Sequence, residues 1–360
     1  MIKVIAIFGG DSTEHDVSII TAVEAMNAVN YVDYKVYPAY ILDGAWYTGE
    51  DMLEVGTFVD FEPKKHKKIR LIGRELQYQK GKRWKHLDDV DVALVLTHGG
   101  VGERGELQGY LELQGLPYTT GDSSALSLCM DKYLTKIAVK DLGYDVVAGV
   151  KISDDCPETA LKVAKKLGYP LFVKPNGQGS SIGVGYALGE KELLEKVEVA
   201  LSYDAQVLIE RGMQNFAEYN CAVLALGDTI VVSEVEKPLT AHDFLSFEDK
   251  YMAFSKGESY DKREFPAKIS DELRQKIKSI AGDIFLKFNL KGVVRFDFIY
   301  ADKLYLNEIN AVPGSLAHYL FPDYTHSTFL SLLIDDALYR KSKKSAVFKS
   351  NVLKIGAPKG

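Results

Sequence analysis

The sequence predicts an α/β fold that becomes α+β in its C-terminal part. Short apolar, β-branched runs such as residues 3–8 and 91–96 alternate with helical stretches over the first two thirds of the chain. Such runs are typical of buried strands, and strands that alternate with helices form a parallel sheet covered on both faces. The last third groups several strands around one long helix at 270–288, which favours an α+β arrangement there.

The first predicted unit, residues 1–121, places two glycine-rich turns at one edge of its sheet. Gly9-Gly10 follow the strand at 3–8, and the turn at 99–105 follows the strand at 91–96. Ligands of parallel sheets bind at the carboxyl ends of the strands, so these turns mark a candidate site. The other predicted elements are a helix at 18–29, a strand at 35–41, a solvated hairpin or meander over 60–86 and a helix at 106–113.

Two further units are predicted, at residues 122–210 and 211–360. Residues 240–266 of the third unit have mixed polarity and no clear period, and a stretch of this length inside a domain is typical of a lid. The predicted helices of these units are at 123–142, 158–167, 190–200 and 270–288. Their predicted strands are at 147–151, 171–175, 183–187, 206–210, 217–225, 229–236, 292–300 and 303–309.

Composition and charge argue against several classes of function. The 360 residues include 44 Lys or Arg and 50 Asp or Glu, a net charge of −6 at pH 7. This balance provides no basic field, so we expect no nucleic-acid partner. Cys129, Cys156 and Cys221 form no CxxC pair, which argues against a disulfide framework or a zinc ribbon. With no run near the ~18 apolar residues of a membrane helix and no signal-peptide pattern, we expect a cytoplasmic protein without a membrane partner.

The first candidate motif is Gly100-Val101-Gly102-Glu103-Arg104-Gly105, which fits the GxGxxG pattern of dinucleotide-binding turns. Asp122 follows at about the spacing of the acidic residue in that fingerprint. However, the first strand of the chain lacks the motif, and Glu103 occupies the middle of the turn, where a pyrophosphate would lie. We therefore favour a small-molecule site at the strand edge, or a plain glycine-rich turn, over a dinucleotide site.

A stronger motif runs from Phe172 to Val184 and joins two β-like segments. Its small residues let backbone N–H groups approach phosphate oxygens, and Lys174 adds a cation. No GK[ST] follows and no helix begins there, so the segment is not a Walker loop. We predict a flexible glycine hairpin over phosphates, with an ordinary β-turn as the alternative.

The third motif lies on two predicted strands near the C-terminal end. Arg295 and Asp297 share one face of the first strand, and Glu308 and Asn310 share one face of the second. Pairing the two strands gathers three oxygen ligands and one guanidinium. Hard oxygen ligands suit Mg²⁺, and the arginine suits a transferring phosphoryl group or an oxyanion. A surface ion pair is the alternative, and the phosphate loop upstream favours the metal site.

Taken in order, these motifs resemble those of the ATP-grasp superfamily, and specifically of the D-alanine–D-alanine ligases. The resemblance spans nearly the whole chain, and its specificity lies in the complete series rather than in any one motif. The matching elements are Gly9-Gly10 with Ser12, Glu14, His15 and Val17-Ser18; His98-Gly99 with Gly102-Glu103, Gly105 and Gln108-Gly109; Leu116-Pro117-Tyr118-Thr119; Met130-Asp131-Lys132; the loop at 173–184; Lys250-Tyr251; Arg295 and Asp297; and Glu308-Ile309-Asn310 with Pro313-Gly314.

The resemblance implies a three-domain ATP-grasp architecture and a two-step reaction. ATP phosphorylates the carboxylate of a first D-alanine, and the amine of a second D-alanine attacks the acylphosphate, giving D-alanyl-D-alanine for peptidoglycan synthesis. Catalysis of such a transfer is mostly positioning and charge neutralisation. The family also implies a homodimer.

The resemblance assigns nucleotide and metal ligands as well. Lys132 and Lys174 would hold phosphates, Lys250 would reach the γ-phosphate from the lid, and Ser181 would lie in the closing loop. Glu210 and the backbone after it would hold adenine and ribose. Two Mg²⁺ ions, for which Mn²⁺ is an alternative, would be held by Asp297, Glu308 and Asn310.

Substrate-binding roles follow in the same way. Glu14 would bind the ammonium of the first D-alanine, and His98 would lie near its carboxylate. Arg295 and the Gly314 N–H would form the oxyanion site of the tetrahedral intermediate. A hydrogen-bonded set linking lid, loop and first substrate would comprise Ser180, Glu218 and Tyr251.

The chain departs from the family pattern at two places. Arg104 stands where an acidic residue is usual. In the stretch from Ser315 to Leu320, which would contact substrate, Tyr319 stands where the family usually has a serine that helps bind the acceptor's carboxylate. We expect D-alanine as acceptor because Lys250-Tyr251 match the D-alanine type. The alternatives are a related ligase that uses D-serine or D-lactate, and a non-catalytic ATP-binding paralogue.

Overall fold

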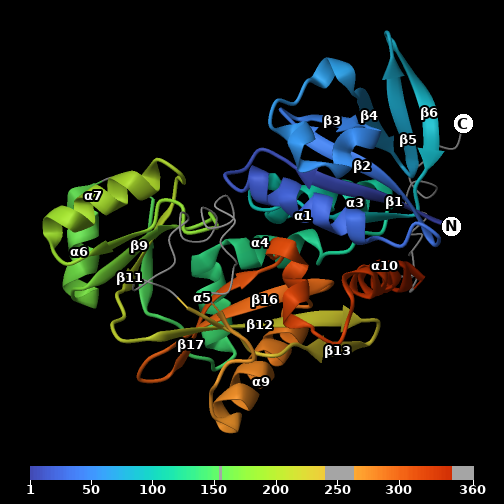
Figure 1. Cartoon of the computed structure of the whole chain (residues 1–360). Helices are drawn as coiled ribbons and strands as arrows, with labels where there is room; N and C mark the ends of the chain where they lie inside the picture. The colour runs from blue at the N-terminus through green and yellow to red at the C-terminus, as the bar shows by residue number, and fades with distance from the viewer. Residues whose placement is uncertain (154–155, 240–262, 343–360) are drawn as a thin grey trace, which may run out of the picture.

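The computed structural model describes residues 1–153, 156–239 and 263–342. In that part of the chain, three larger sheets and one small sheet surround a common centre (Figure 1). The N-terminal sheet lies at the upper right of the view, a central sheet at the left and a C-terminal sheet at the bottom. Residues 240–262 of the predicted lid lie outside the described ranges, and Lys250 and Tyr251 with them.

The N-terminal sheet is mixed rather than wholly parallel as predicted. β1 (Ile2–Gly9) pairs in parallel with β2 (Tyr34–Leu42) on one side and with β7 (Val92–Val95) on the other. The other strands are antiparallel to their neighbours, because tight turns join β2 to the next strand and connect the members of the meander. They are β3 (Ala45–Thr48), β4 (Lys67–Ile72), β5 (Glu75–Lys80) and β6 (Arg83–Asp89), and they confirm the meander predicted within 60–86.

The helices of this unit lead directly into the turns at the sheet edge. α1 (His15–Ala28) packs against β1 and begins at His15 rather than near Ser18. α2 (Gly100–Glu103) and α3 (Glu106–Gln114) follow β7. Gly105 between them has a φ of +105°, a conformation that glycine adopts without strain. The 3₁₀ helices of this unit are η1 (Glu50–Leu53), η2 (Val55–Phe58) and η3 (Pro63–Lys65).

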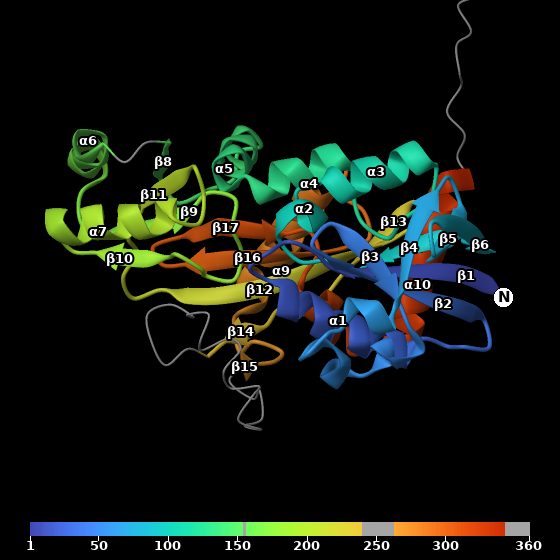
Figure 2. The same ribbon diagram turned by 90° about the horizontal axis from the view of Figure 1, so that it is seen from above.

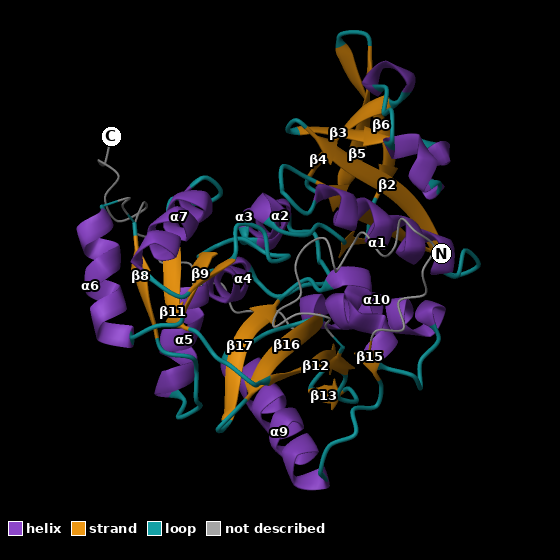
Figure 3. Cartoon of the chain, turned by 60° about the vertical axis from the view of Figure 1, so that its left-hand side comes forward, coloured by secondary structure: helices purple, strands orange, loops and turns teal. Residues whose placement is uncertain are grey.

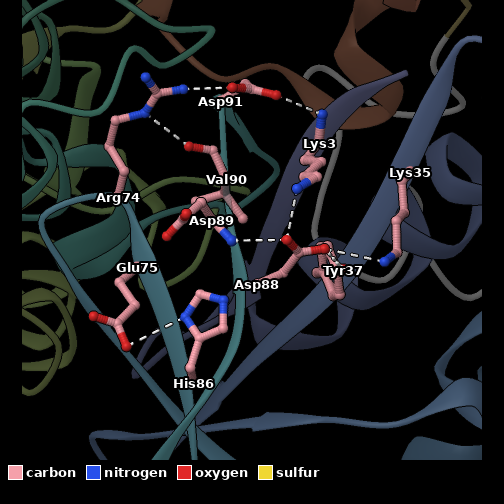
Figure 4. A network of polar contacts seen from close by, with 10 residues as sticks. All are labelled: Lys3, Lys35, Tyr37, Arg74, Glu75, His86, Asp88, Asp89, Val90 and Asp91. Atoms are coloured by element: carbon pink, nitrogen blue, oxygen red, sulfur yellow. Dashed lines mark hydrogen bonds and ion pairs between the residues drawn. The ribbon is translucent and has the colours of Figure 1, made fainter.

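A polar network joins distant strands of the N-terminal sheet (Figure 4). The Asp88 carboxylate on β6 accepts hydrogen bonds from Lys3 Nζ at 2.6 Å, from Lys35 Nζ at 3.0 Å and from the Tyr37 hydroxyl. Asp91, just before β7, accepts from the Lys3 backbone N–H at 2.9 Å. The hydrogen bonds from Lys3 and Tyr37 hold the pKa of Asp88 far below its ordinary value. The network therefore ties β6 to β1 and β2, which are not its neighbours in the sheet.

The central sheet is antiparallel throughout, in the order β10-β9-β11-β8. Two helices cover it at the left of Figure 1 and share an apolar core with its strands. The strands are β8 (Gly149–Ile152), β9 (Leu171–Pro175), β10 (Gly185–Ala187) and β11 (Val207–Arg211), and the helices are α6 (Pro157–Leu167) and α7 (Glu190–Leu201).

The single helix predicted over 123–142 is wrong, because the structure has two. α4 (Ser123–Met130) and α5 (Lys132–Asp141) meet at Asp131, whose φ of −78° and ψ of 98° are extended. The Asp131 side chain accepts a hydrogen bond from the Leu134 N–H at 2.8 Å and so caps α5. Figure 2 and Figure 3 show both helices between the central sheet and α2 and α3.

The C-terminal sheet is antiparallel, in the order β13-β12-β16-β17. The predicted long helix is confirmed as α9 (Asp271–Lys287), and Ser270 caps it by accepting from the Leu273 N–H at 3.2 Å. The strands are β12 (Ala217–Leu226), β13 (Thr229–Val232), β16 (Val293–Tyr300) and β17 (Leu304–Asn310), and the small sheet is β14 (Lys237–Pro238) with β15 (Arg263–Glu264). The chain continues through the 3₁₀ segment η4 (Gly314–Leu320) and α10 (His326–Ser342).

The apolar core divides the molecule unequally. One cluster of buried side chains runs from α1 and β1 across to β12, β16 and α10, so the N-terminal and C-terminal sheets share a core. The central sheet has a separate core. Burial of apolar area is the main stabilising contribution in a fold. The central sheet is therefore the part whose position depends least on the shared core.

Candidate active site

The glycine loop of the central sheet reaches the edge of the N-terminal sheet. The loop connects β9 to β10, and Ser180 in it donates a hydrogen bond to the Glu14 carboxylate at the start of α1. Ser12 orients this turn, because its hydroxyl accepts from the Glu14 N–H at 3.0 Å. A Cβ at Gly179 would come within 2.8 Å of the Glu14 carboxyl carbon, so only glycine allows this approach. The structure thus brings Glu14 and Ser180 together.

Protein groups anchor the loop on both sides of its tip. The Gly177 N–H donates to Asp204 at 2.6 Å, and Gln178 Nε2 donates to the Tyr203 carbonyl at 3.1 Å. Ser180 and Ser181 have φ values of +52° and +58°, in the left-handed region. As predicted, the loop joins two antiparallel strands, and its backbone at the serines is held in a conformation that side chains rarely adopt.

A buried hydrogen-bond chain connects the turn after β7 with the loop after β17. The His98 Nδ1–H donates to the Val312 carbonyl at 2.7 Å, and His98 Nε2 accepts from the Thr21 hydroxyl at 2.9 Å. The Thr21 hydroxyl in turn accepts from the Ser315 N–H at 3.1 Å. This order of donors requires a neutral imidazole, and burial of His98 lowers its pKa in the same sense.

Glu103 binds the same C-terminal loop. One of its oxygens accepts from the Val312 N–H and the other from the Gly99 N–H, both at 3.0 Å. Burial, with a further contribution from Glu14, raises the pKa of Glu103 to about 7. The turn at 99–105 is therefore occupied by a glutamate bound to backbone donors, which is incompatible with a pyrophosphate at that point.

The predicted nucleotide ligands form a buried cluster with one residue that the sequence analysis missed. Lys174 on β9 and Lys136 on α5 approach different oxygens of Glu210 on β11, at 2.7 and 2.5 Å. Lys132, at the start of α5, donates to the Gln178 carbonyl in the glycine loop. The cluster holds three cations against one anion, a net positive charge that suits phosphate groups.

Burial shapes the titration of this cluster. It lowers the pKa of Lys132 and of Lys136, because a buried ammonium loses hydration. Burial alone would raise the pKa of Glu210, but Lys136 and Lys174 outweigh it and lower that pKa. Glu210 is therefore an anion held between two lysines in this structure.

The two C-terminal strands pair in the register that gathers the predicted metal ligands. Arg295 lies opposite Asn310, and Asp297 lies opposite Glu308. The Arg295 guanidinium binds both oxygens of Asp297, at 2.7 and 2.9 Å, and Asn310 Nδ2 donates to Asp297 at 3.0 Å. Burial would lower the pKa of Arg295, but the adjacent Asp297 carboxylate raises it further above its ordinary value.

The donor set fits a magnesium site of the type completed by substrate oxygens. Asp297, Glu308 and Asn310 supply two carboxylates and one amide, all hard oxygen ligands. Among the described residues, no three His, Cys, Asp or Glu side chains converge as an all-protein metal site. A site of this composition therefore depends on phosphate oxygens and water for its remaining ligands.

The segment after Gly314 carries the predicted acceptor residues. Gly314 begins η4, and no atom lies within 4 Å of where its side chain would be. Ser315 donates to Glu24 at 2.9 Å, and the Tyr319 hydroxyl donates to Glu236 at 3.3 Å. Burial raises the pKa of Tyr319 well above its ordinary value. The tyrosine thus lies in the site, bonded to a buried glutamate.

The remaining predicted residues and those missed can now be placed. Glu218 lies on β12 opposite Ile299, while Lys250 and Tyr251 lie outside the described residues. One missed residue had a sequence signal, since Lys136 follows Lys132 by one helical turn. The others, which gather only through tertiary contacts, are Thr21, Glu103, Glu236 and Arg263.

Two antiparallel sheets with a glycine loop, buried lysines and paired oxygen ligands between them define an ATP-grasp enzyme. The family model described as "D-ala D-ala ligase N-terminus" matches residues 3–121, and that described as "D-ala D-ala ligase C-terminus" matches residues 135–332. The chain therefore belongs to the D-alanine–D-alanine ligase family. Its activity is the ATP-dependent joining of two D-alanines for peptidoglycan precursor synthesis.

Individual relatives agree with this assignment. The D-alanine–D-alanine ligase of Thermosipho melanesiensis is 37% identical and covers 99% of both chains. The crystal structure of the Helicobacter pylori D-alanine–D-alanine ligase superposes with a TM-score of 0.78 at 28% identity, covering 96% of this chain and 100% of that one. The VanG D-Ala:D-Ser ligase of Enterococcus faecalis gives a TM-score of 0.78 at 29% identity, covering 93% and 99%. No helix of the described part is long and apolar enough to cross a membrane.

Proposed function

We propose that three units of the chain each contribute one part of the ligation site. These units are residues 1–121 for the first substrate, 122–210 for the nucleotide, and 211–360 for the metal and the acceptor. Each span contains its own sheet, and this supports the division. We further propose a cytoplasmic homodimer, as in the family resemblance.

In the first step, the carboxylate of D-alanine attacks the γ-phosphorus of ATP and ADP leaves. Glu14 binds the ammonium of this D-alanine, and the neutral His98 lies on the side of its carboxylate. Lys132 and Lys174 hold the phosphates, while Ser180 and Ser181 cover them. Glu210 and the backbone that follows bind adenine and ribose, and Lys250 reaches the γ-phosphate. The Ser180–Glu14 hydrogen bond supports this arrangement, because it places the phosphate loop against the first-substrate site.

Two Mg²⁺ ions, or Mn²⁺ in their place, would be held by Asp297, Glu308 and Asn310 with the nucleotide phosphates, and they would neutralise charge during phosphoryl transfer. Arg295 pairs with Asp297 in the present structure, so its guanidinium already lies beside these ligands. The strand register that places Asp297 opposite Glu308 carries this part of the proposal.

In the second step, the amine of the second D-alanine attacks the acylphosphate carbon, the C–N bond forms and phosphate leaves with one carboxylate oxygen. Arg295 and the Gly314 N–H stabilise the oxyanion, because preorganised donors act most strongly where charge develops. Ser315 and Tyr319 lie on the acceptor side. Ser180, Glu218 and Tyr251 link the loop and the lid to the first substrate.

The test separates the two steps. Purified protein, ATP, Mg²⁺ and D-alanine are incubated with hydroxylamine, which traps D-alanyl phosphate as the hydroxamate. We expect hydroxamate from the parent and from Asp302→Asn, which alters an exposed turn, but a loss of at least tenfold in Asp297→Asn. Equal hydroxamate from Asp297→Asn and the parent would remove Asp297 from the metal site.

A further inference from the structure

We propose that Arg263 binds the carboxylate of the acceptor amino acid, oriented by the Tyr319 ring and by Glu236. The proposal rests on the proposed function, since it assumes that the acceptor lies beside Arg295 and Gly314. It assigns to this chain an arginine in the place where the family resemblance implies a serine hydroxyl.

The Tyr319 hydroxyl has no proton left for a substrate carboxylate. A phenol carries one O–H, and Tyr319 donates it to Glu236 Oε1 at 3.3 Å. Asn220 Nδ2 donates to the same Glu236 oxygen at 2.9 Å. Because the phenol oxygen can then only accept, it repels a carboxylate rather than binding one. The donors for the acceptor's carboxylate must come from another side chain.

Glu236 is held firmly enough to orient its neighbours. Its backbone N–H and carbonyl each bond the backbone of Asn220 at 3.0 Å, and its side chain is buried. The charged groups that act on Glu236 are Arg263 and Arg295, which lower its pKa, and Asp297, which raises it. Glu236 is therefore a fixed point that Tyr319 and Arg263 share, and it acts as a positioning residue.

Arg263 presents its guanidinium beside this fixed point. The guanidinium carbon lies 4.6 Å from the centre of the Tyr319 ring, and stacking of this kind fixes the guanidinium plane. Its nearer nitrogen is 3.8 Å from Glu236 Oε2, longer than a hydrogen bond, so its N–H groups can bind a second anion.

Accessibility and charge both suit a small carboxylate. The Arg263 side chain is 35% exposed, so a ligand can reach it, whereas the Glu236 side chain is 5% exposed. A planar guanidinium binds both oxygens of a carboxylate at once. Arg295 acts on both Tyr319 and Glu236, so Arg263 and the oxyanion site lie around the same two side chains. An acceptor bound there has its carboxylate at Arg263 and its amine free to react.

A competition between two acceptors tests the proposal. D-alanine is supplied with D-alaninamide, which lacks the carboxylate charge, and the two products are quantified by mass spectrometry. In Arg263→Met we expect the ratio of D-alanyl-D-alanine to D-alanyl-D-alaninamide to fall about tenfold or more. The matched control is Arg70→Met, which removes an arginine stacked at 4.3 Å on Trp84, and we expect the parent ratio there.

The outcomes separate this proposal from the function it rests on. If the parent yields no hydroxamate with D-alanine, ATP and Mg²⁺, the proposed reaction itself is wrong. If the parent is active and Arg263→Met keeps the parent ratio, the Arg263 assignment is overturned. Should Arg263→Met fail to fold, Glu236→Gln carries the test, with Glu234→Gln as its control. A fall in the ratio in Glu236→Gln alone supports the assignment, and an unchanged ratio overturns it.

Discussion

Ser180 donates a hydrogen bond to Glu14 across 166 positions of sequence. This contact joins the loop of the central sheet to the turn that begins α1, and thus connects two separate apolar cores. The ends of the contact are the residues to which we assign phosphate closure and ammonium binding. One hydrogen bond therefore couples the proposed nucleotide site to the proposed first-substrate site.

Replacing Glu14 with Gln should weaken binding of the first D-alanine. The amide keeps an acceptor for Ser180 but removes the charge that pairs with the substrate ammonium. We expect the KM of the hydroxamate assay for D-alanine to rise roughly tenfold or more, with a smaller change in the KM for ATP. Asp16→Asn, an exposed change on the same helix, is the control. Equal effects on both KM values would separate Glu14 from the substrate ammonium.

Replacing Arg295 with Ala should remove transition-state stabilisation. The guanidinium is the charged donor of the proposed oxyanion site, and loss of such a donor costs roughly 3–4 kcal/mol in kcat/KM. Dipeptide formation under steady-state conditions measures the effect, with the exposed Arg83→Ala as control. A rate within twofold of the parent would contradict the role of Arg295.

Replacing Lys136 with Met should act on Lys174 through Glu210. The variant leaves Glu210 with Lys174 as its remaining lysine partner of the cluster, so Lys174 is held more tightly away from phosphate. We expect a higher KM for ATP at an unchanged KM for D-alanine. We also expect a loss of about 3 kcal/mol in the free energy of unfolding in urea, because a buried pair is broken. Lys140→Met, one turn along α5 and exposed, should change neither quantity.

Replacing Asp88 with Asn should destabilise the N-terminal sheet without affecting catalysis. The pKa of Asp88 is lower in the folded than in the unfolded state, so its stabilisation is present above about pH 4 and is lost as the pH falls further. We expect the Tm of the variant to lie a few degrees below that of the parent at pH 7. The gap should close in acid. Asp89→Asn is the control, and a gap that stays constant down to pH 3 would contradict the role of the Asp88 charge.

The sequence predicted the metal ligands because a strand has a period of two. Arg295 and Asp297, and likewise Glu308 and Asn310, alternate with apolar residues, and the observed register pairs these two sets. The helix break at Asp131 was not predicted, because aspartate is compatible with both a helix interior and a helix cap until its hydrogen-bond partner is known. The mixed sheet was missed because the lysine-rich meander lacks the long apolar runs of buried strands.

Charged pairs were the least predictable features. The Lys136–Glu210 and Tyr319–Glu236 contacts join residues distant in sequence, and each depends on how the three sheets come together. Local periodicity contains no information on such pairs. Glu103 shows the same limit, since its position in a GxGxxG turn is explained only by the Val312 N–H that it binds.

The most direct test of the central claim follows one oxygen atom. D-alanine labelled with ¹⁸O in its carboxylate is converted by the purified protein with ATP and Mg²⁺, and the released phosphate is analysed by mass spectrometry. If the assembled site phosphorylates D-alanine, each dipeptide formed is accompanied by phosphate with one ¹⁸O from the carboxylate. Dipeptide formed with unlabelled phosphate, or no dipeptide at all, would contradict the account.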